Sequence, residues 1–247
     1  MNAVLLVHGF PFDHLLWRHQ LAALSRWQCI APDLRGAGTS SGPDSPDEYS
    51  MAGYAADLIR LLDELRIERA VVCGLSMGGY IAFELLRQVP ERIRAVILCN
   101  TKAVADTPEV KRGRDVLAAR ALKEGARGVA DELVPKLLAR ATSERRPEVV
   151  REVTEMILRQ PVSGIVGALR ALRERPDSTP LLPRIRVPVL VVAADDDQIA
   201  PAAGMQEMAR AIAGAQVALI PSAGHVAPLE QPLAVNAALV NFLRKLP

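Results

Sequence analysis

The sequence predicts an α/β protein whose mostly parallel sheet is covered by helices on both faces, and two observations support this class. Short apolar runs rich in Val, Ile, Leu and Cys punctuate the chain, at residues 3–7, 28–31, 70–73, 94–99, 187–193 and 216–220. Most of the segments between them carry apolar residues at the spacing of one helix face. Nearly continuous apolar strands that alternate with helices are typical of a parallel sheet buried on both sides.

The composition is that of an ordinary folded protein. Of the 247 residues, 50% are hydrophobic and 23% are charged, which excludes a disordered chain and allows a core that needs no disulfide or structural metal. The formal net charge of +2 offers nucleic acid no strong electrostatic footprint. The cysteines Cys29, Cys73 and Cys99 lie inside apolar runs, as buried and reduced thiols usually do.

The start of the chain and its apolar runs bear on where the protein works. Residues 1–9 lack the basic stretch and the long apolar stretch of a secretory signal. No apolar run reaches the roughly 18 residues that a membrane span needs. Together with the reduced cysteines, these features predict a cytoplasmic protein without membrane contact.

Helical periodicity predicts the elements between the strands. Helices are expected at residues 49–65, 77–88, 202–213 and 233–246. In the first of these, Leu58, Leu61, Leu62 and Leu65 recur at helical spacing. The alternation of strands and helices stops between residues 108 and 176, where no strand-like run occurs.

Residues 108–176 are predicted to form a helical insertion, here called the cap, and residues 1–107 and 177–247 to form the core. Four helical segments are expected in the cap, at 109–124, 128–140, 147–160 and 162–174, with a kink at Pro135. The cap holds 15 Lys or Arg against 10 Asp or Glu, a net charge of +5. Because ligands bind at the carboxyl edge of such sheets, we expect the cap to cover an active site.

The segment 70–79 carries the strongest chemical signal. An apolar strand runs into Gly74-Leu75-Ser76-Met77-Gly78-Gly79 and then into a helical pattern. A nucleophile elbow has this form, because its sharp strand-to-helix turn strains the serine backbone and needs small residues on both sides. Ser76 is therefore the candidate nucleophile, and the alternative is a glycine-rich turn without chemistry.

A serine nucleophile needs a base, and the base needs a carboxylate that orients it. His225 lies in a loop directly after the last predicted strand, and such loops gather above the sheet. Asp195, Asp196 and Asp197 directly follow the strand at 187–193, so one of them is expected to be the orienting acid. The alternative for His225 is that it only stabilises its loop.

The chain order Ser, Asp, His and several motifs resemble the α/β-hydrolase superfamily. The motifs are His-Gly-Phe-Pro-Phe-Asp-His-x-x-Trp at residues 8–17, Ala-Pro-Asp-Leu-Arg-Gly at 31–36 and Gly-Leu-Ser-Met-Gly-Gly-Tyr at 74–80. They are most similar to bacterial 3-oxoadipate enol-lactonase-like hydrolases and small carboxylesterases. The cofactor-free haloperoxidases and perhydrolases are also similar, particularly at the Asp-Gln-Ile-x-Pro string of residues 197–201.

The resemblance implies roles for individual residues. The family pattern Asp-x-x-x-Pro selects Asp197, because Pro201 stands at the matching position. The oxyanion-hole amides are assigned to Met77, which follows the nucleophile, and to Phe10, by the family motif His-Gly-x. His8 is expected to brace that loop, and Asp33 to hold a neighbouring turn.

One departure from the family pattern concerns the start of the sheet. Family members usually open with a β-hairpin before the His-Gly strand, whereas only seven residues precede His8. We therefore expect an α/β-hydrolase fold with about six strands, in which the strand at 28–31 lacks its usual neighbour. Because an exposed edge needs cover or pairing, either a monomer or a homodimer is expected.

Neither a metal nor a cofactor is expected. His14 and His19 are five residues apart and lack a third partner at metal-ligand spacing. The string Arg-Gly-Ala-Gly at residues 35–38 does not continue into a dinucleotide-binding fingerprint. The expected partner is a small molecule alone.

These residues predict a serine hydrolase of small carboxylic esters or lactones, in which Ser76 attacks, His225 acts as base and then acid, and Asp197 orients His225. A perhydrolase or haloperoxidase-like enzyme with the same residues is the first alternative. A protein that binds a ligand without turnover is the second. Besides the oxyanion-hole residues, the predicted lining of the substrate pocket is Phe12, Trp17, Val134, Leu137, Leu138 and Met156. The positive cap would steer an anionic substrate, or it is only a solvated arginine-rich surface.

Overall fold

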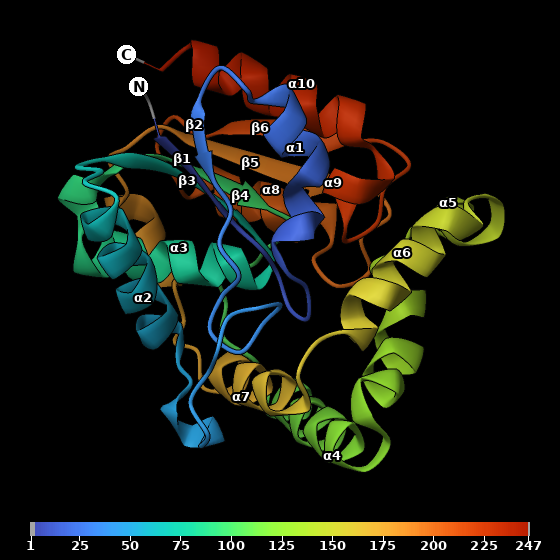
Figure 1. The fold of residues 1–247 in the computed structure, drawn as a ribbon. Coiled ribbons are helices and arrows are strands. Elements are labelled where there is room, and N and C mark those ends of the chain that lie inside the picture. The colour runs from blue at the N-terminus through green and yellow to red at the C-terminus, as the bar shows by residue number, and fades with distance from the viewer. Residues whose placement is uncertain (1–2, 247) are drawn as a thin grey trace.

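The computed structural model describes residues 3–246 and contains one parallel sheet in the order β2-β1-β3-β4-β5-β6 (Figure 1). The strands are β1 Ala3–Val7, β2 Gln28–Ile30, β3 Ala70–Leu75, β4 Ile93–Cys99, β5 Val189–Ala194 and β6 Gln216–Ile220. All five neighbouring pairs are parallel. The predicted α/β class and the reduced sheet of six strands are both confirmed.

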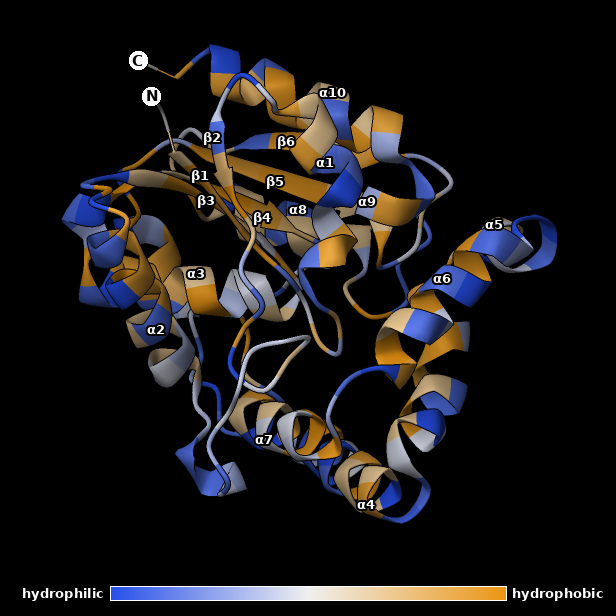
Figure 2. Ribbon diagram, viewed as in Figure 1, coloured by the Kyte–Doolittle hydropathy of each residue, from blue (hydrophilic) through white to orange (hydrophobic). Residues whose placement is uncertain are grey.

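The inner strands β1, β3 and β5 are apolar along their whole length because both of their faces are covered. Every residue of β1, β3 and β5 is buried, and the strands stand out as apolar in Figure 2. By contrast, β2 pairs only with β1 and is partly exposed, as expected for an edge strand that lacks a second neighbour.

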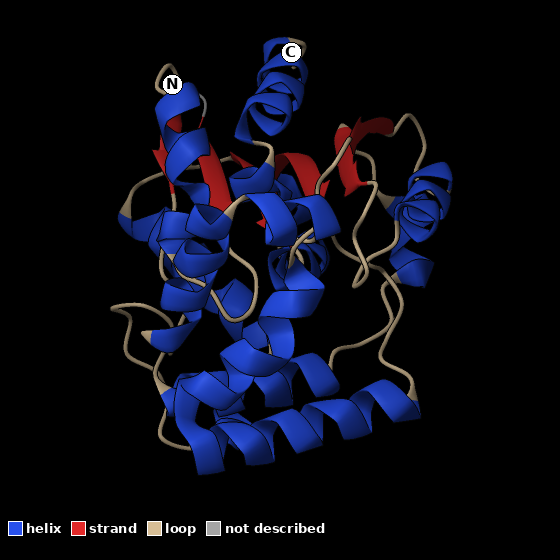
Figure 3. Cartoon of the chain, turned by 90° about the vertical axis from the view of Figure 1, so that its right-hand side faces the viewer, coloured by secondary structure: helices blue, strands red, loops and turns tan. Residues whose placement is uncertain are grey.

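The sheet separates two apolar clusters, because successive side chains of a strand point to opposite faces. In β1, Val4 and Leu6 face one cluster, and Leu5 and Val7 face the other. Helices α1 and α10 cover the first face, and α2, α3 and α8 cover the second (Figure 1). Figure 3 shows helices on both sides of the strands. The core helices are α1 Arg18–Ala23, α2 Met51–Glu64, α3 Met77–Gln88, α8 Ala202–Arg210, α9 Ala227–Glu230 and α10 Pro232–Arg244. Short 3-10 helices span His14–Trp17, Pro46–Glu48, Pro90–Arg92 and Thr179–Arg184.

Four helices lie between β4 and β5, within the segment set apart as the cap. They are α4 Pro108–Leu137, α5 Arg140–Arg145, α6 Pro147–Leu158 and α7 Val162–Arg173. Figure 1 shows them as an arch beyond the sheet, with α7 and α4 running beneath it and α6 rising on one side. Among the described residues, none of the helices is both long and apolar enough to cross a membrane.

The break within α4 lies between the two helices predicted at 109–124 and 128–140, whereas the kink predicted at Pro135 is corrected. The backbone leaves the helical region at Gly125, where φ is 69° and ψ is −165°, rather than at Pro135. Glycine adopts a positive φ without a Cβ clash, so the chain can turn there between the two halves of α4. A proline can kink a helix because it lacks an N–H and its ring clashes with the preceding turn. Pro135 lies only two residues before the end of α4 at Leu137, so almost no helix follows it that could be bent away.

Candidate active site

Ser76 lies at the sharp turn between β3 and α3. Its φ of 52° and ψ of −110° place it in a strained region that a non-glycine residue rarely adopts. Two hydrogen bonds hold this conformation: Ser76 N donates to Cys99 O at 2.9 Å, and Thr101 Oγ1 donates to Ser76 O at 2.7 Å. Both partners lie at the end of β4, so the neighbouring strand fixes the position of the serine.

The glycines around Ser76 are required by close backbone contacts. A Cβ on Gly74 would lie 2.2 Å from Gly78 O, and a Cβ on Gly78 would lie 2.2 Å from Val7 O. Because neither backbone oxygen can move without shifting a strand or a helix, any larger residue would open the turn. The turn therefore has the geometry that the glycine spacing predicts.

The side chains of His225 and Asp197 meet although 28 residues separate them. His225 Nδ1 lies 2.8 Å from Asp197 Oδ2, and both side chains are almost completely buried. The backbone amide of His225 donates to Leu137 O in the cap at 2.8 Å. The loop that carries His225 is thus held by the core on one side and by the cap on the other.

Asp197 accepts four hydrogen bonds. Its Oδ1 accepts from the amides of Ile199 and Ala200 at 2.8 and 2.9 Å, and its Oδ2 accepts from Asn100 Nδ2 at 2.9 Å as well as from His225. Burial raises the pKa of this carboxyl, but the opposing effects of His225 and these donors are larger, so the pKa lies below its usual value. The group is therefore held as a carboxylate.

Sequence reasoning missed Asn100. It directly follows β4, is completely buried, and also donates through Nδ2 to Gly224 O at 3.4 Å. The sequence did contain a sign of its role, because Asn100 is a polar residue at the carboxyl end of an apolar strand, where ligands and catalytic groups gather in such sheets.

The other two aspartates of the triplet point elsewhere. Asp195 Oδ1 accepts from Ala223 N at 3.4 Å, and Asp196 Oδ2 accepts from Arg140 N at 2.9 Å. In the described part of the chain, neither of them forms a hydrogen bond or ion pair with His225, whose carboxylate partner is Asp197. The geometry thus favours Asp197 as the partner of His225.

Ser76 and His225 line the same cavity, which has a volume of about 190 Å³. Phe10 also lines it. Met77 is the first residue of α3, so its amide has no acceptor within the helix. The remaining lining residues come mainly from the cap and from the strand ends: Tyr80, Lys102, Arg114, Leu117, Leu133, Lys136, Leu137, Leu172 and Ile199.

The predicted lining agrees with this cavity only at Leu137. Phe12, Trp17, Leu138 and Met156 are at most 1% exposed and belong to the apolar core, and Val134 packs against that core. The prediction rested on their place in the chain, which does not determine which side of a helix or loop faces the cavity. Two adjacent residues of α4 differ for this reason: both Leu133 and Val134 pack against the core, but only Leu133 also lines the cavity.

The loop after β1 is braced by His8. His8 Nε2 accepts from Leu34 N at 3.0 Å, which leaves Nδ1 to donate to Gly9 O at 2.9 Å. Burial lowers the pKa of His8 despite the opposing effect of its contact with Gly9, so the ring stays neutral in this role. His8 thus ties the loop that carries Phe10 to the chain after β2.

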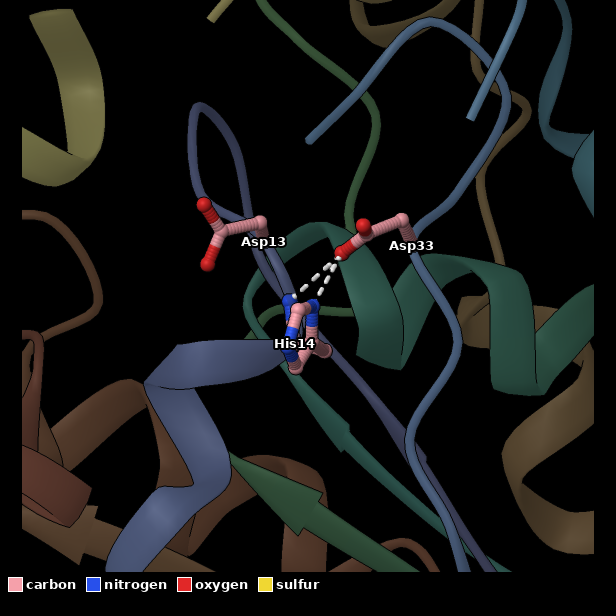
Figure 4. A group of neighbouring side chains, drawn as sticks. All are labelled: Asp13, His14 and Asp33. Atoms are coloured by element: carbon pink, nitrogen blue, oxygen red, sulfur yellow. Dashed lines mark hydrogen bonds and ion pairs between the residues drawn. The ribbon is translucent and has the colours of Figure 1, made fainter. Parts of the chain in front are cut away.

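Asp13, His14 and Asp33 form a cluster beside this loop (Figure 4). Asp33 Oδ1 accepts from His14 N and Nδ1 at 2.9 and 2.8 Å, and its Oδ2 accepts from Thr39 N at 2.9 Å. Asp13 Oδ2 accepts from Arg159 Nε at 2.7 Å. Because protein donors already occupy these oxygens, the cluster ties turns together and does not offer a metal an open ligand set.

Comparisons with known proteins agree with this architecture. A 3-oxoadipate enol-lactonase from Acinetobacter baylyi is 30% identical over 231 residues, which are 93% of this chain and 84% of that protein. A thermophilic esterase from Thermogutta terrifontis, solved with malate bound, superposes with a TM-score of 0.96 at 41% identity and covers 100% of this chain and 90% of its own. A proposed non-heme bromoperoxidase from Mycobacterium tuberculosis gives a TM-score of 0.85 at 26% identity and covers 100% and 93%.

The family follows from the match of a whole-domain model together with the six-stranded sheet and the turn at Ser76. The model of the alpha/beta hydrolase fold matches residues 2–232 of this sequence. The chain belongs to the α/β-hydrolase fold family.

Proposed function

We propose that this α/β hydrolase is a serine hydrolase that cleaves small carboxylic esters or lactones through an acyl-enzyme on Ser76. One observation carries the proposal. A strained serine and a buried histidine line one cavity, and the histidine is hydrogen-bonded to a buried carboxylate at 2.8 Å. The similarity to an enol-lactonase and to an esterase supports the same substrate class.

The first step forms the acyl-enzyme. With Nδ1 of His225 donating to Asp197, the other ring nitrogen, Nε2, is free to accept the hydroxyl proton of Ser76. The serine oxygen attacks the carbonyl carbon, and the ring passes the proton to the departing alkoxide. The buried carboxylate of Asp197 stabilises the imidazolium that exists between these two transfers.

The amides of Phe10 and Met77 are proposed to bind the oxyanion. Met77 stands at the N-terminus of α3, where unpaired amides and the helix dipole favour negative charge. In the second half of the reaction water attacks the acyl carbon, His225 removes its proton, and Ser76 regains one as the acid leaves. A lactone follows the same steps, except that its alcohol stays attached to the acid.

The proposal is tested by hydrolysis of p-nitrophenyl acetate in the first turnover and at steady state. Ser76→Ala should lower the rate by a factor on the order of 10⁴ and remove any burst of p-nitrophenol. Ser25→Ala, at an exposed serine in the loop before β2, is the matched control and should behave like the wild type. Equal rates in the wild type and Ser76→Ala would rule out the acyl-enzyme.

A second candidate keeps the same residues but changes the acceptor. The likeness to a proposed bromoperoxidase at 26% identity favours testing hydrogen peroxide in place of water. Attack of peroxide on the acyl-enzyme would release a peracid, which oxidises bromide. Bromination of a dye in acetate and peroxide that depends on Ser76 would support this activity, and bromination that persists in Ser76→Ala would exclude it.

A further inference from the structure

The cavity at Ser76 is lined by basic side chains and by no acidic one among its described lining residues. Lys102 comes from the segment that follows β4, and Arg114 and Lys136 come from the two halves of α4. The rest of the lining is apolar or aromatic apart from Ser76 and His225. This arrangement favours a ligand with negative charge.

Two of these three cations already have carboxylate partners. Arg114 Nε bonds Asp106 Oδ2, and Lys136 pairs with Glu132 one helical turn away. Asp106 is shared, because its Oδ1 also lies 2.6 Å from the buried guanidinium of Arg175. Asp106 thus already faces the guanidinium groups of Arg114 and Arg175.

Lys102 forms no ion pair or hydrogen bond with any residue in the part of the chain that the structure describes. Burial lowers the pKa of its ammonium, and the nearby Arg175 and Arg114 lower it further, against the smaller opposing effects of Asp106 and Asp197. An unpaired cation in a partly dehydrated cavity is costly. A carboxylate delivered by a ligand would offset that cost.

The backbone fixes Lys102 close to the nucleophile. Its neighbour Thr101 is completely buried and donates from Oγ1 to Ser76 O at 2.7 Å. On the other side of Thr101, Asn100 contacts Asp197. Lys102 thus continues a segment that is already fixed to two residues of the candidate active site, so its position does not depend on a mobile loop.

We propose that Lys102 determines substrate specificity by binding a free carboxylate carried on the acyl part of the substrate. The substrate class is then half-esters of short dicarboxylic acids, and lactones that carry a carboxylate. This inference rests on the proposed ester chemistry at Ser76 and adds the group that the cavity selects. A charge-assisted bond from the ammonium to the carboxylate supplies the selectivity.

The test compares two esters of equal chain length, monomethyl succinate and methyl butanoate. In Lys102→Met, the ratio of kcat/KM for the anionic ester to that for the neutral ester should fall about tenfold, mainly through KM. Lys102→Arg should restore most of the ratio, because it keeps the charge. Lys123→Met removes the same charge from an exposed site on α4 outside the cavity lining and should leave the ratio unchanged.

The ratio of the two kcat/KM values separates recognition of the carboxylate from a general loss of activity. If Lys102→Met lowered kcat/KM equally for both esters, the loss would act through the neighbouring catalytic groups, and the proposal would be overturned. It would also be overturned if Lys123→Met reduced the ratio as much as Lys102→Met, since bulk charge would then explain the preference.

A binding measurement keeps this inference separate from the proposed hydrolysis. Glutarate, which has no ester bond, is titrated calorimetrically into the wild type and Lys102→Met, with circular dichroism to verify the fold. Binding that weakens about tenfold in the variant supports the anion site even if neither ester is turned over, in which case only the hydrolase proposal fails. Equal affinity, or no binding to either protein, overturns the anion site.

Discussion

Replacing Asp197 by asparagine exchanges one carboxylate oxygen for an NH₂ group at nearly constant size. Both oxygens of Asp197 accept from two donors each, at distances between 2.8 and 2.9 Å. An asparagine has only one acceptor oxygen, so its NH₂ group must face two donors in either orientation. The structure therefore allows the cost of each orientation to be compared.

If the NH₂ group replaced Oδ1, it would face the amides of Ile199 and Ala200, neither of which can become an acceptor. Two buried donors would lose their partner, at about 1–3 kcal/mol each. If it replaced Oδ2, only Asn100 Nδ2 would lose its acceptor, because His225 can move its ring proton from Nδ1 to Nε2. The second orientation costs less and should be the one adopted.

That orientation removes the proposed general base. With its proton on Nε2, His225 cannot accept the hydroxyl proton of Ser76, so Asp197→Asn should lower kcat by a factor of roughly 10³–10⁴. The free energy of unfolding should fall by only about 1–3 kcal/mol, from the single lost acceptor of Asn100.

The assay measures steady-state hydrolysis of p-nitrophenyl acetate beside urea unfolding of the same samples. Asp196→Asn is the matched control, because Asp196 accepts from Arg140 N on the cap and does not contact His225. A loss of less than about tenfold in a folded Asp197→Asn protein, or an equal loss in the control, would refute the assignment.

Three further expectations follow from the geometry. Gly78→Ala should cost more than about 3 kcal/mol of unfolding free energy or prevent soluble expression, because its Cβ would lie 2.2 Å from Val7 O, as urea melts would reveal. Asn100→Ala should lower kcat/KM about tenfold in the same ester assay, since it removes one donor that keeps the pKa of Asp197 low. Burial raises the pKa of Asp33, but stronger hydrogen bonds lower it to about 2, below its ordinary 3.8. Asp33 therefore stabilises the fold above pH 3.8 and loses that contribution as the pH falls toward 2, so Asp33→Asn should cost about 1–2 kcal/mol at neutral pH and little near pH 2 in pH-dependent melts.

The strands could be predicted because a buried strand appears in the sequence as a short run of apolar residues. A strand covered on both faces is apolar at nearly every position, and the runs at 70–73 and 94–99 end within two residues of β3 and β4. The run at 216–220 coincides with β6, although this edge strand is largely exposed. The break near the middle of α4 was likewise expected between residues 124 and 128 and occurs at Gly125. In contrast, α5 was missed, because its sequence Arg-Ala-Thr-Ser-Glu-Arg has no apolar stripe.

The cavity could not be predicted in the same way, because its lining depends on how the cap docks. Lys102 and Arg114 are separated in sequence from Lys136 and meet only when α4 folds back over the strand ends. A pattern along one helix shows which face is apolar, but not whether that face meets the core or the cavity. The candidate residues Ser76, Asp197 and His225 could therefore be found from local sequence, whereas the lining of the cavity could not.

Leu137 shows that cavity shape and catalytic geometry are not independent in this fold. Its side chain lines the cavity, and its backbone oxygen accepts from the amide of His225 at 2.8 Å. Glu230 adds a second connection between the cap and this loop. Its carboxylate accepts from Ala139 N, just after α4, and from Gly224 N, next to His225, at 2.8 Å each. A change in the cap that shifts this backbone would move the proposed base together with the cavity wall. Substitutions that alter substrate preference from α4 should therefore be chosen at side chains such as Leu117 and Leu133, which line the cavity from earlier turns and leave the anchor at Leu137 intact.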